Sequence, residues 1–405
     1  MPHTLIKSFQ ILLVSLLVVC SFHFFEAKFL GKAFVYYLPF FYVSFAIAIS
    51  IPFFITQREG FVLPVQLIVL AMLISMVFAH LSWGQGFTNC LLGTIPMMLW
   101  VFFFYLLQKR IPVQTIEKII VAYGIIYIGL FFYQLLHSQT VVFGSGEEFT
   151  EERGTVRVYI AGQGGLFLAS FMALNKLTSQ KKYRLFWIAL SFAGLAIPII
   201  QATRQFILGV LIIFVYHFIK DVSIFKKVVV MVLFSGLLVY YVTVSNNVII
   251  KGLVETQEQT AQEGRDNLRV LSGAYFLTEL SPTNINKVFG NGVPSGEDSS
   301  YSRFVDSLNQ YGLYMSDVGI IAVYAMFGII GVLGYILIWI KSFSLPLPKN
   351  YYYLKYYLWF LLVTSLTSDT IYSYNFLICT VLVIYLYQIQ YLDQLELTRY
   401  SISST

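Results

Sequence analysis

Long apolar runs constrain this chain more than any other feature. A helix needs roughly 20 predominantly apolar residues to cross the hydrocarbon core of a bilayer. Apolar segments of about that length recur along the whole chain, at 9–25, 35–55, 61–79, 88–107, 116–136, 159–175, 184–201, 204–219, 228–250, 317–340, 352–368 and 371–389. The pattern predicts an all-α polytopic membrane protein with about 12 transmembrane helices.

The low charge content excludes the common soluble classes. Only 11% of the 405 residues are charged and the mean hydropathy is +0.74, whereas a soluble domain carries about 25% charged residues. A cytosolic multidomain enzyme, a nucleic-acid-binding protein, a disordered chain and a secreted disulfide scaffold are therefore all disfavoured. The net charge of +6 has to be interpreted through membrane topology rather than through an acidic partner.

The basic residues predict the orientation. About sixteen Lys and Arg fall in segments that share one side of the membrane, while the short loops on the other side hold only Lys28, Lys32 and Arg204. The positive-inside rule then places both termini in the cytoplasm. The first apolar run ends without a small-residue cleavage site, so we expect a retained helix rather than a signal peptide.

These spans divide the chain into five parts. Residues 1–136 hold transmembrane helices 1–5, 137–158 form a first outer loop, 159–250 hold helices 6–9, 251–316 form a large outer loop, and 317–405 hold helices 10–12 and a cytoplasmic tail. In the large loop, apolar residues from Leu268 to Phe276 recur every three or four positions, which predicts an amphipathic helix. Turn residues follow at 281–284 and 290–296. Its many aromatic residues favour a folded, outward-facing site over a disordered tether.

Metal and redox chemistry find little support in the sequence. The three cysteines, Cys20, Cys90 and Cys379, lie in or beside apolar spans and read as small buried hydrophobes. The cluster Glu147, Glu148, Glu151 and Glu152 could bind a divalent ion, but without a fixed ligand spacing a solvated acidic face is favoured. His80 and His137 are interpreted as structural, and no nucleotide-binding loop is present. We therefore expect no cofactor and no metal.

Arginines at the outer ends of spans are the strongest candidates for binding. Arg157 precedes the segment 159–175, and Arg204 lies in a very short connection between two spans. The guanidinium fork suits phosphate, although such residues can also extend toward lipid headgroups. Because Arg265, Arg269 and Arg303 share the same predicted side, a phosphate-binding function is favoured.

Asp317 is the candidate base. It stands at the start of the segment 317–340, where reduced hydration would raise the pKa of a carboxyl group and suit it to general-base catalysis. The alternative is a helix N-cap, since Asp before an apolar helix satisfies free backbone donors. Asp369, in the last short outer loop, is a poorer candidate and is expected to be a cap.

Three stretches resemble the bacterial O-antigen ligase and polymerase family. Asp317-Val318-Gly319-Ile320-Ile321, followed by Gly328-Ile329-Ile330-Gly331, is similar to the span that follows that family's large loop. Thr203-Arg204 resembles its Ser/Thr-Arg pair before a span. Arg269 with Tyr275-Phe276-Leu277, and then Phe289-Gly290-Asn291-Gly292, resembles its large-loop pattern. The ligases typically carry His followed by Asn where this chain has Asp317 and Val318, which favours a polymerase.

The resemblance implies a lipid-dependent inverting glycosyltransferase of the GT-C-like class in the bacterial inner membrane. It would join surface-polysaccharide (O-antigen) repeat units carried on undecaprenyl diphosphate at the periplasmic face, in lipopolysaccharide biosynthesis. The diphosphate would meet Arg157, Arg204, Arg265, Arg269 and Arg303, and Asp317 would accept the proton of the acceptor hydroxyl. Implied partners are lipid-linked glycans, membrane lipid, a chain-length regulator and a flippase. The alternatives are a ligase that transfers the glycan to lipid A core, or a polytopic glycolipid flippase or transporter.

Overall fold

The protein is a helical bundle. The computed structural model describes residues 3–55, 59–144, 151–152, 155–220 and 267–403, and these are helical except for connecting loops and one short antiparallel hairpin, β1 (Glu151–Glu152) with β2 (Thr155–Val156). The predicted all-α class is thus confirmed. Within this part of the chain, six segments are long and apolar enough to cross a membrane: Lys32–Phe53, Val62–Trp83, Phe87–Lys109, Val113–Leu136, Ile320–Ser344 and Tyr374–Thr398. The chain is accordingly a multi-pass membrane protein. The predicted span 228–250 lies outside the described residues.

The helices before the hairpin follow the predicted spans closely. They are α1 (His3–Ser21), η1 (His23–Glu26), η2 (Lys28–Leu30), α2 (Lys32–Ser50), η3 (Ile51–Phe53), α3 (Val62–Trp83), α4 (Phe87–Thr94), η4 (Ile95–Val101), α5 (Phe102–Lys109) and α6 (Val113–Leu136). The segment 88–107 is not one regular helix, because Pro96 lacks an N–H donor and a 3₁₀ stretch, η4, follows α4 there.

The helices after the hairpin include the amphipathic helix expected in the large loop. They are α7 (Gln163–Ser179), α8 (Arg184–Ile200), α9 (Arg204–Ile219), α12 (Leu268–Thr278), α13 (Asn284–Phe289), α14 (Ser300–Gln310), η7 (Met315–Asp317), α15 (Ile320–Ser344), η8 (Lys349–Tyr351), α16 (Tyr352–Thr364) and α17 (Tyr374–Ser403). On α12, Phe276 is buried while Leu268 and Leu271 are exposed.

Two of the spans predicted after the hairpin differ from the helices that form. The segment 159–175 begins outside a helix, because Gly162 takes a left-handed φ of +99° and α7 starts only at Gln163. The segment 352–368 yields α16, whose 13 residues rise roughly 20 Å. That length is shorter than the roughly 30 Å hydrocarbon core. The count of 12 transmembrane helices is therefore not established.

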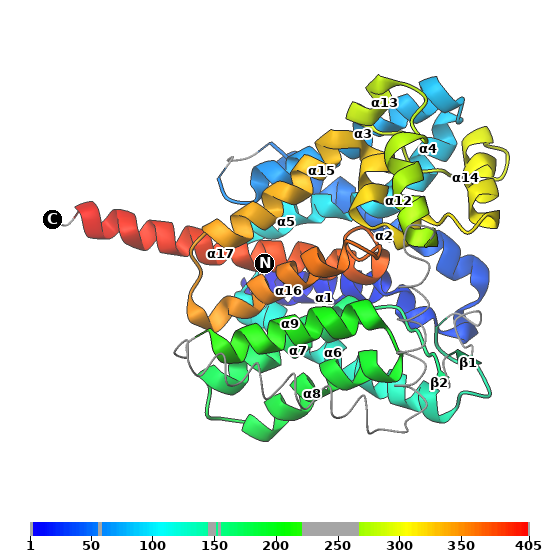
Figure 1. The fold of residues 1–405 in the computed structure, drawn as a ribbon. Helices are drawn as coiled ribbons and strands as arrows, with labels where there is room; N and C mark the ends of the chain where they lie inside the picture. Colours follow the sequence, from blue (N-terminus) through cyan, green and yellow to red (C-terminus); the bar gives the residue numbers. More distant parts are fainter. Residues whose placement is uncertain (1–2, 56–58, 145–150, 153–154, 221–266, 404–405) are drawn as a thin grey trace.

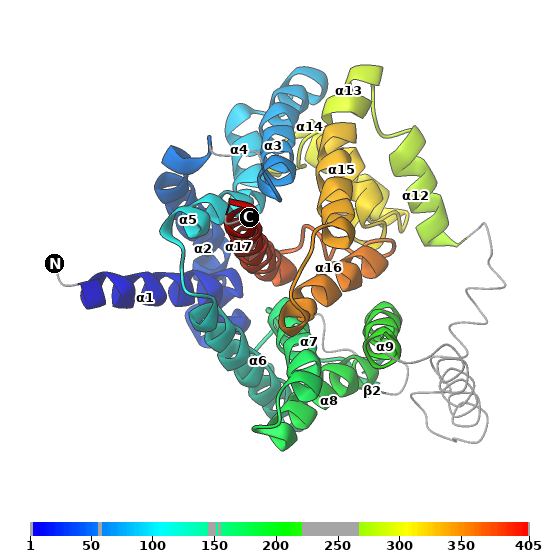
Figure 2. The same ribbon diagram turned by 90° about the vertical axis from the view of Figure 1, so that its left-hand side faces the viewer.

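The core of the bundle lies between α7, α16 and α17. Figure 2 shows α17 surrounded by other helices, and it contacts α1, α5, α7 and α16. Every residue of α7 from Gln163 to Asn175 is buried. The rings of five phenylalanines from α7, α9, α16 and α17 pack together: Phe167, Phe171, Phe206, Phe360 and Phe376. The apolar side chains that the bundle buries here form the base of the site described below.

The two ends of the bundle differ in character. Figure 1 shows α12, α14 and the hairpin at one end, and the C-terminus of α17 projecting from the other. At the C-terminal end, Lys176 Nζ lies 2.7 Å from Glu117 Oε2, and Asn175 Nδ2 donates to the carbonyl of Asn350 at 2.8 Å. The sequence predicted that these segments share one side of the membrane, and the contacts show that they lie together at one end of the bundle.

Candidate functional site

Residues from six separate segments line a polar cavity of about 380 Å³ at the end of the bundle that carries α12. We call it the arginine pocket. It is lined by Arg157, Tyr159, Gln163, Ala202, Thr203, Arg204, Gln205, Phe206, Arg269, Asp317, Ser368, Asp369, Asn375 and Phe376. Three of the predicted arginines and the predicted base therefore face one cavity, although 160 positions separate the first of them from the last by residue number.

Three helices begin at this cavity. Gln163 is the first residue of α7, Arg204 is the first residue of α9, and Asn375 is the second residue of α17. A helix N-terminus carries roughly half a positive charge and unpaired backbone N–H groups, which favour anions. Three arginines stand against two aspartates in the lining. This arrangement of charges and dipoles favours an anion over a cation.

Arg157 is held by the turn between α8 and α9. Its Nε donates to the carbonyl of Gln201 at 3.2 Å, its guanidinium bonds the Tyr159 hydroxyl, and it lies over the Tyr159 ring, 5.0 Å from the centroid. The Tyr159 hydroxyl in turn lies 3.1 Å from Thr203 Oγ1. These contacts fix the guanidinium in the cavity wall before any ligand arrives.

The same turn sets the position of Arg204. Ala202 has φ +52°, a left-handed conformation that costs an L-residue with a side chain about 1 kcal/mol or more. Because Ala202 turns the chain, α9 can start two residues after it, with Arg204 in the first turn of the helix. Backbone strain of this kind is commonly found at functional sites.

Arg269 and Asp317 meet at the pocket from opposite sides of the large loop. Asn267 caps α12 by accepting a hydrogen bond from the Arg269 backbone N–H at 3.0 Å. The Arg269 Nε then lies 3.9 Å from Asp317 Oδ2. Both side chains remain partly exposed, so each can still contact a ligand.

Asp317 does not cap α15. It ends the short 3₁₀ turn η7, and Gly319 takes the N-cap position with φ +42°. A Cβ at Gly319 would overlap the carbonyl oxygen of Ser365, and Ile320 N–H donates to that carbonyl at 2.8 Å. Glycine is required for this close approach, which brings η7 against the connection between α16 and α17. The capping alternative for Asp317 is thus not realised.

That connection also supplies Asp369, which the sequence predicted to be a cap. The residue lines the arginine pocket instead of serving only as a cap. Burial raises the pKa of the Asp369 carboxyl; hydrogen bonds from Ser373 and Ser368 partly oppose this effect, while the negative charge of Asp317 adds to it. The pocket therefore holds two carboxyl groups, one of which binds a proton more tightly than an ordinary aspartate.

The base of the pocket is aromatic and closely packed. Phe206 and Phe376 line it, with ring centroids 5.8 Å apart. Beside them, Gly162 N–H donates to Asn375 Oδ1 at 3.0 Å, and a Cβ at Gly164 would press on the backbone at Asn375. This contact orients Asn375 toward the cavity. The sequence offered one signal for it, the Gly162-Gln163-Gly164-Gly165 run at the start of a span.

Other predicted residues lie elsewhere. Arg303 is exposed on α14 and does not line the arginine pocket. Arg265 lies outside the described residues, as do the side chains of the acidic cluster from Glu147 to Glu152. All three cysteines are free and buried, as expected. His80 Nδ1 lies 2.9 Å from the carbonyl of Gln85, and His137 stacks on Tyr133, consistent with structural roles.

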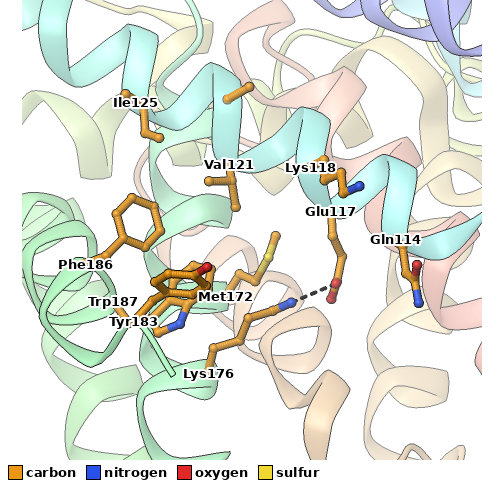
Figure 3. A pocket seen from close by; sticks show the side chains of 11 residues that line it. Gln114, Glu117, Lys118, Val121, Ile125, Met172, Lys176, Tyr183, Phe186 and Trp187 are labelled. Carbon is orange, nitrogen blue, oxygen red and sulfur yellow. Dashed lines mark hydrogen bonds and ion pairs between the residues drawn. The ribbon is translucent and has the colours of Figure 1, made fainter. Parts of the chain in front are cut away.

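A second cavity, of about 640 Å³, lies at the opposite end of the bundle between α6, α7 and α8 (Figure 3). Figure 3 shows the ion pair between Lys176 and Glu117 at one side of it, and the side chains of Ile125 and Phe186 at the other. Most of its wall is hydrocarbon, and its carboxylate and one of its ammonium groups are already paired. It offers no comparable set of groups for catalysis.

Comparison with known proteins identifies no relative: no family model and no curated protein matches the chain.

Proposed function

We propose that the protein is a membrane-embedded glycosyltransferase that joins oligosaccharide repeat units carried on undecaprenyl diphosphate, at the periplasmic face of the bacterial inner membrane. The observation that carries the proposal is the arginine pocket. Arg157, Arg204 and Arg269 converge there with three helix N-termini and two carboxyl groups. The resemblance to the O-antigen ligase and polymerase family supports the same reaction.

The pocket suits a single displacement at an anomeric carbon. The acceptor hydroxyl oxygen forms a bond to that carbon while the bond to the diphosphate oxygen breaks, and the electron pair leaves with the diphosphate. The arginines and helix N-termini stabilise the charge that develops on the leaving group. The hydroxyl proton passes to a carboxylate of the pocket. No nucleotide is needed, because a lipid diphosphate is already an activated leaving group.

The proton acceptor is one of two aspartates. Asp317 is the residue that the sequence favoured, and its carboxylate lies 3.9 Å from Arg269 Nε, which supports this role. Asp369 is the competitor, because its raised pKa makes it the stronger base once ionised. Two neighbouring carboxyl groups in different environments are a frequent arrangement for acid–base catalysis.

A ligase that acts on lipid A core is the nearest alternative, and a deletion strain separates the two activities. Cells without a polymerase still attach one repeat unit to lipid A core, whereas cells without a ligase attach none. We expect the single-repeat product. Accumulation of undecorated lipid A core would contradict the polymerase proposal, and loss of repeat units from the periplasmic face would instead identify a flippase.

A reconstituted assay tests the chemistry directly. Purified protein in nanodiscs is incubated with the lipid-linked repeat unit, and polymer length is measured on gels. Polymer should form with chelator present and without nucleotide. The variant Lys181→Ala/Lys182→Ala, with two exposed lysines changed between α7 and α8, is a suitable control that should polymerise normally. Failure of the wild-type protein to extend the substrate would contradict the proposal.

A further inference from the structure

A second recess shares the first turn of α17 with the arginine pocket. We call it the lysine groove; its volume is about 400 Å³, and its lining includes Glu26, Lys28, Lys32, Tyr36 and Tyr374. Tyr374 and Asn375 are consecutive residues, and they line the lysine groove and the arginine pocket respectively. The two recesses therefore adjoin at the first turn of α17.

The groove is held by contacts between the loop after α1 and the first turn of α17. The Tyr374 hydroxyl donates to Glu26 Oε1 at 2.6 Å, and the Tyr374 ring stacks on His23 with centroids 4.2 Å apart. His23 is 9% exposed, and its buried Nε2 has no hydrogen-bond partner. Lys28 N–H donates to the carbonyl of Val142 at 2.9 Å, which ties the loop to the chain after α6. These contacts preform the groove.

The backbone conformation of η1 also indicates that the groove is preformed. Four consecutive residues other than glycine, from His23 to Glu26, have φ between +48° and +58°. Left-handed backbone costs such residues roughly 1–2 kcal/mol each. Strain of this size persists only where surrounding contacts over-determine it.

The position of the two lysines of the groove, on the predicted outer side of the membrane, requires an explanation. Lys28 and Lys32 are exposed, and with Arg204 they are the three basic residues in the short loops predicted on the outer side. Basic residues are disfavoured there. Arg204 lines the arginine pocket, and both lysines line the groove. Each exception to the rule thus lies in a recess, where an ammonium or guanidinium group can bind phosphate.

Two tyrosines give the groove a surface suited to sugars. Tyr36 is largely exposed and Tyr374 partly so, and each presents an apolar ring face with a hydroxyl. A sugar ring has an apolar face and hydroxyl groups at its edge, so the two surfaces are complementary. Glu26 adds an acceptor for sugar hydroxyls.

We propose that the lysine groove binds the acceptor substrate, a second glycan carried on a polyprenyl diphosphate. Lys28 and Lys32 bind its diphosphate, Tyr36 and Tyr374 contact its sugars, and its free end reaches the arginine pocket past Asn375. The inference rests on the proposed polymerase function, in which donor and acceptor both carry a lipid diphosphate. It assigns the two diphosphates to two separate sites.

Counting bound lipid tests the assignment. Purified protein in phosphatidylcholine nanodiscs is titrated with undecaprenyl diphosphate that carries no glycan, and native mass spectrometry counts the molecules bound per chain. We expect two for the wild-type protein and for Lys181→Ala/Lys182→Ala, which removes the same charge elsewhere. We expect one for Lys28→Ala/Lys32→Ala and one for Arg157→Ala/Arg204→Ala. Thermal unfolding confirms that each variant is folded.

The outcomes separate the two proposals. If Lys28→Ala/Lys32→Ala still binds two molecules, the acceptor site is wrong. If phosphatidylglycerol displaces undecaprenyl diphosphate from the lysine groove at equal concentration, the groove is a phospholipid headgroup site and the assignment is also wrong. If Arg157→Ala/Arg204→Ala keeps both molecules, it is the donor site of the proposed polymerase that fails.

A kinetic measurement gives an independent criterion. The donor is capped at its non-reducing end so that it cannot accept, and the acceptor carries a phosphonate link so that it cannot donate. Lys28→Ala/Lys32→Ala should raise the KM for the acceptor about tenfold, which corresponds to about 1.4 kcal/mol, and leave the KM for the donor within a factor of about two. An equal rise in both KM values would overturn the assignment.

Discussion

Arg269 Nε lies 3.9 Å from Asp317 Oδ2, and the two side chains are 45% and 40% exposed. An ion pair this exposed contributes about 0–1 kcal/mol to stability. The pair joins the first turn of α12 to η7, across the large loop. The pair contributes mainly by position, because it holds a cation and a carboxylate side by side, as the proposed reaction between a diphosphate-linked sugar and a hydroxyl requires.

Replacing Arg269 should separate activity from stability. Arg269→Gln is expected to lower the polymerisation rate by about 10²-fold, comparable to the loss of one donor to a developing anion. Its unfolding free energy should change by less than about 1 kcal/mol. Arg303→Gln is the informative comparison, because Arg303 is exposed on α14, away from the pocket. Equal losses in both variants would argue against the arginine pocket as the diphosphate site.

Arg204 offers a test of geometry rather than charge. Arg204→Lys keeps the positive charge in the first turn of α9 but removes the planar guanidinium fork, which is able to bind two phosphate oxygens at once. We expect kcat to fall at least about tenfold, since one bidentate charge-assisted contact is lost. The rate is measured in nanodiscs with saturating substrate. Near-normal activity would exclude bidentate binding by Arg204.

Asp369 should reveal its environment through the pH dependence of stability. Burial raises the pKa of the folded-state carboxyl above that of the unfolded chain, about 3.9. Its stabilising contribution is thus complete below that value and is lost as the pH rises through the folded-state pKa. Asp369→Asn removes the cost of ionisation, so it should raise the Tm at pH 7 and have a diminishing effect toward pH 4. A constant Tm difference across that range would refute the explanation.

The two carboxyl groups can be assigned by comparing their amide variants. If Asp317 is the base, Asp317→Asn should abolish chain growth while Asp369→Asn retains part of it; the reverse result would assign the proton to Asp369. Western blotting confirms membrane insertion, and polymer length is scored on gels. Wild-type chain lengths in Asp317→Asn would exclude the general-base role that the sequence favoured.

The sequence predicted the arginines of the site better than its other residues. Arg157, Arg204 and Asp317 stood out because charge at the end of an apolar span is costly, so its position is informative. Tyr159, Thr203 and Asn375 carry no such signal, since neutral polar residues at span ends are common. Asp369 was predicted to be a cap, because the sequence of its loop shows neither that its side chain is buried nor that Asp317 lies nearby.

For the fold, the hydropathy pattern predicted the positions of long helices, whereas it did not predict the local features that depend on packing. Hydropathy located α3 and α6 to within a few residues, because each is a continuous apolar run. It could not reveal the 3₁₀ stretch of η4 or the brevity of α16, where proline and tertiary contacts override the apolar pattern. The lysine groove depends on left-handed backbone at η1. That conformation could not be predicted from the sequence, because η1 contains no glycine.

Gly319 tests whether the placement of Asp317 depends on the close contact between η7 and the α16–α17 connection. With φ +42° and the Ser365 carbonyl where a Cβ would stand, Gly319→Ala should cost at least about 2 kcal/mol and move Asp317 away from Arg269. Gly129→Ala is the matched control, because Gly129 lies inside α6 with open space around it and alanine should stabilise that helix by about 0.5–1 kcal/mol. Thermal unfolding in detergent and chain-length assays measure both. An active, equally stable Gly319→Ala protein would show that this contact does not position the carboxylate.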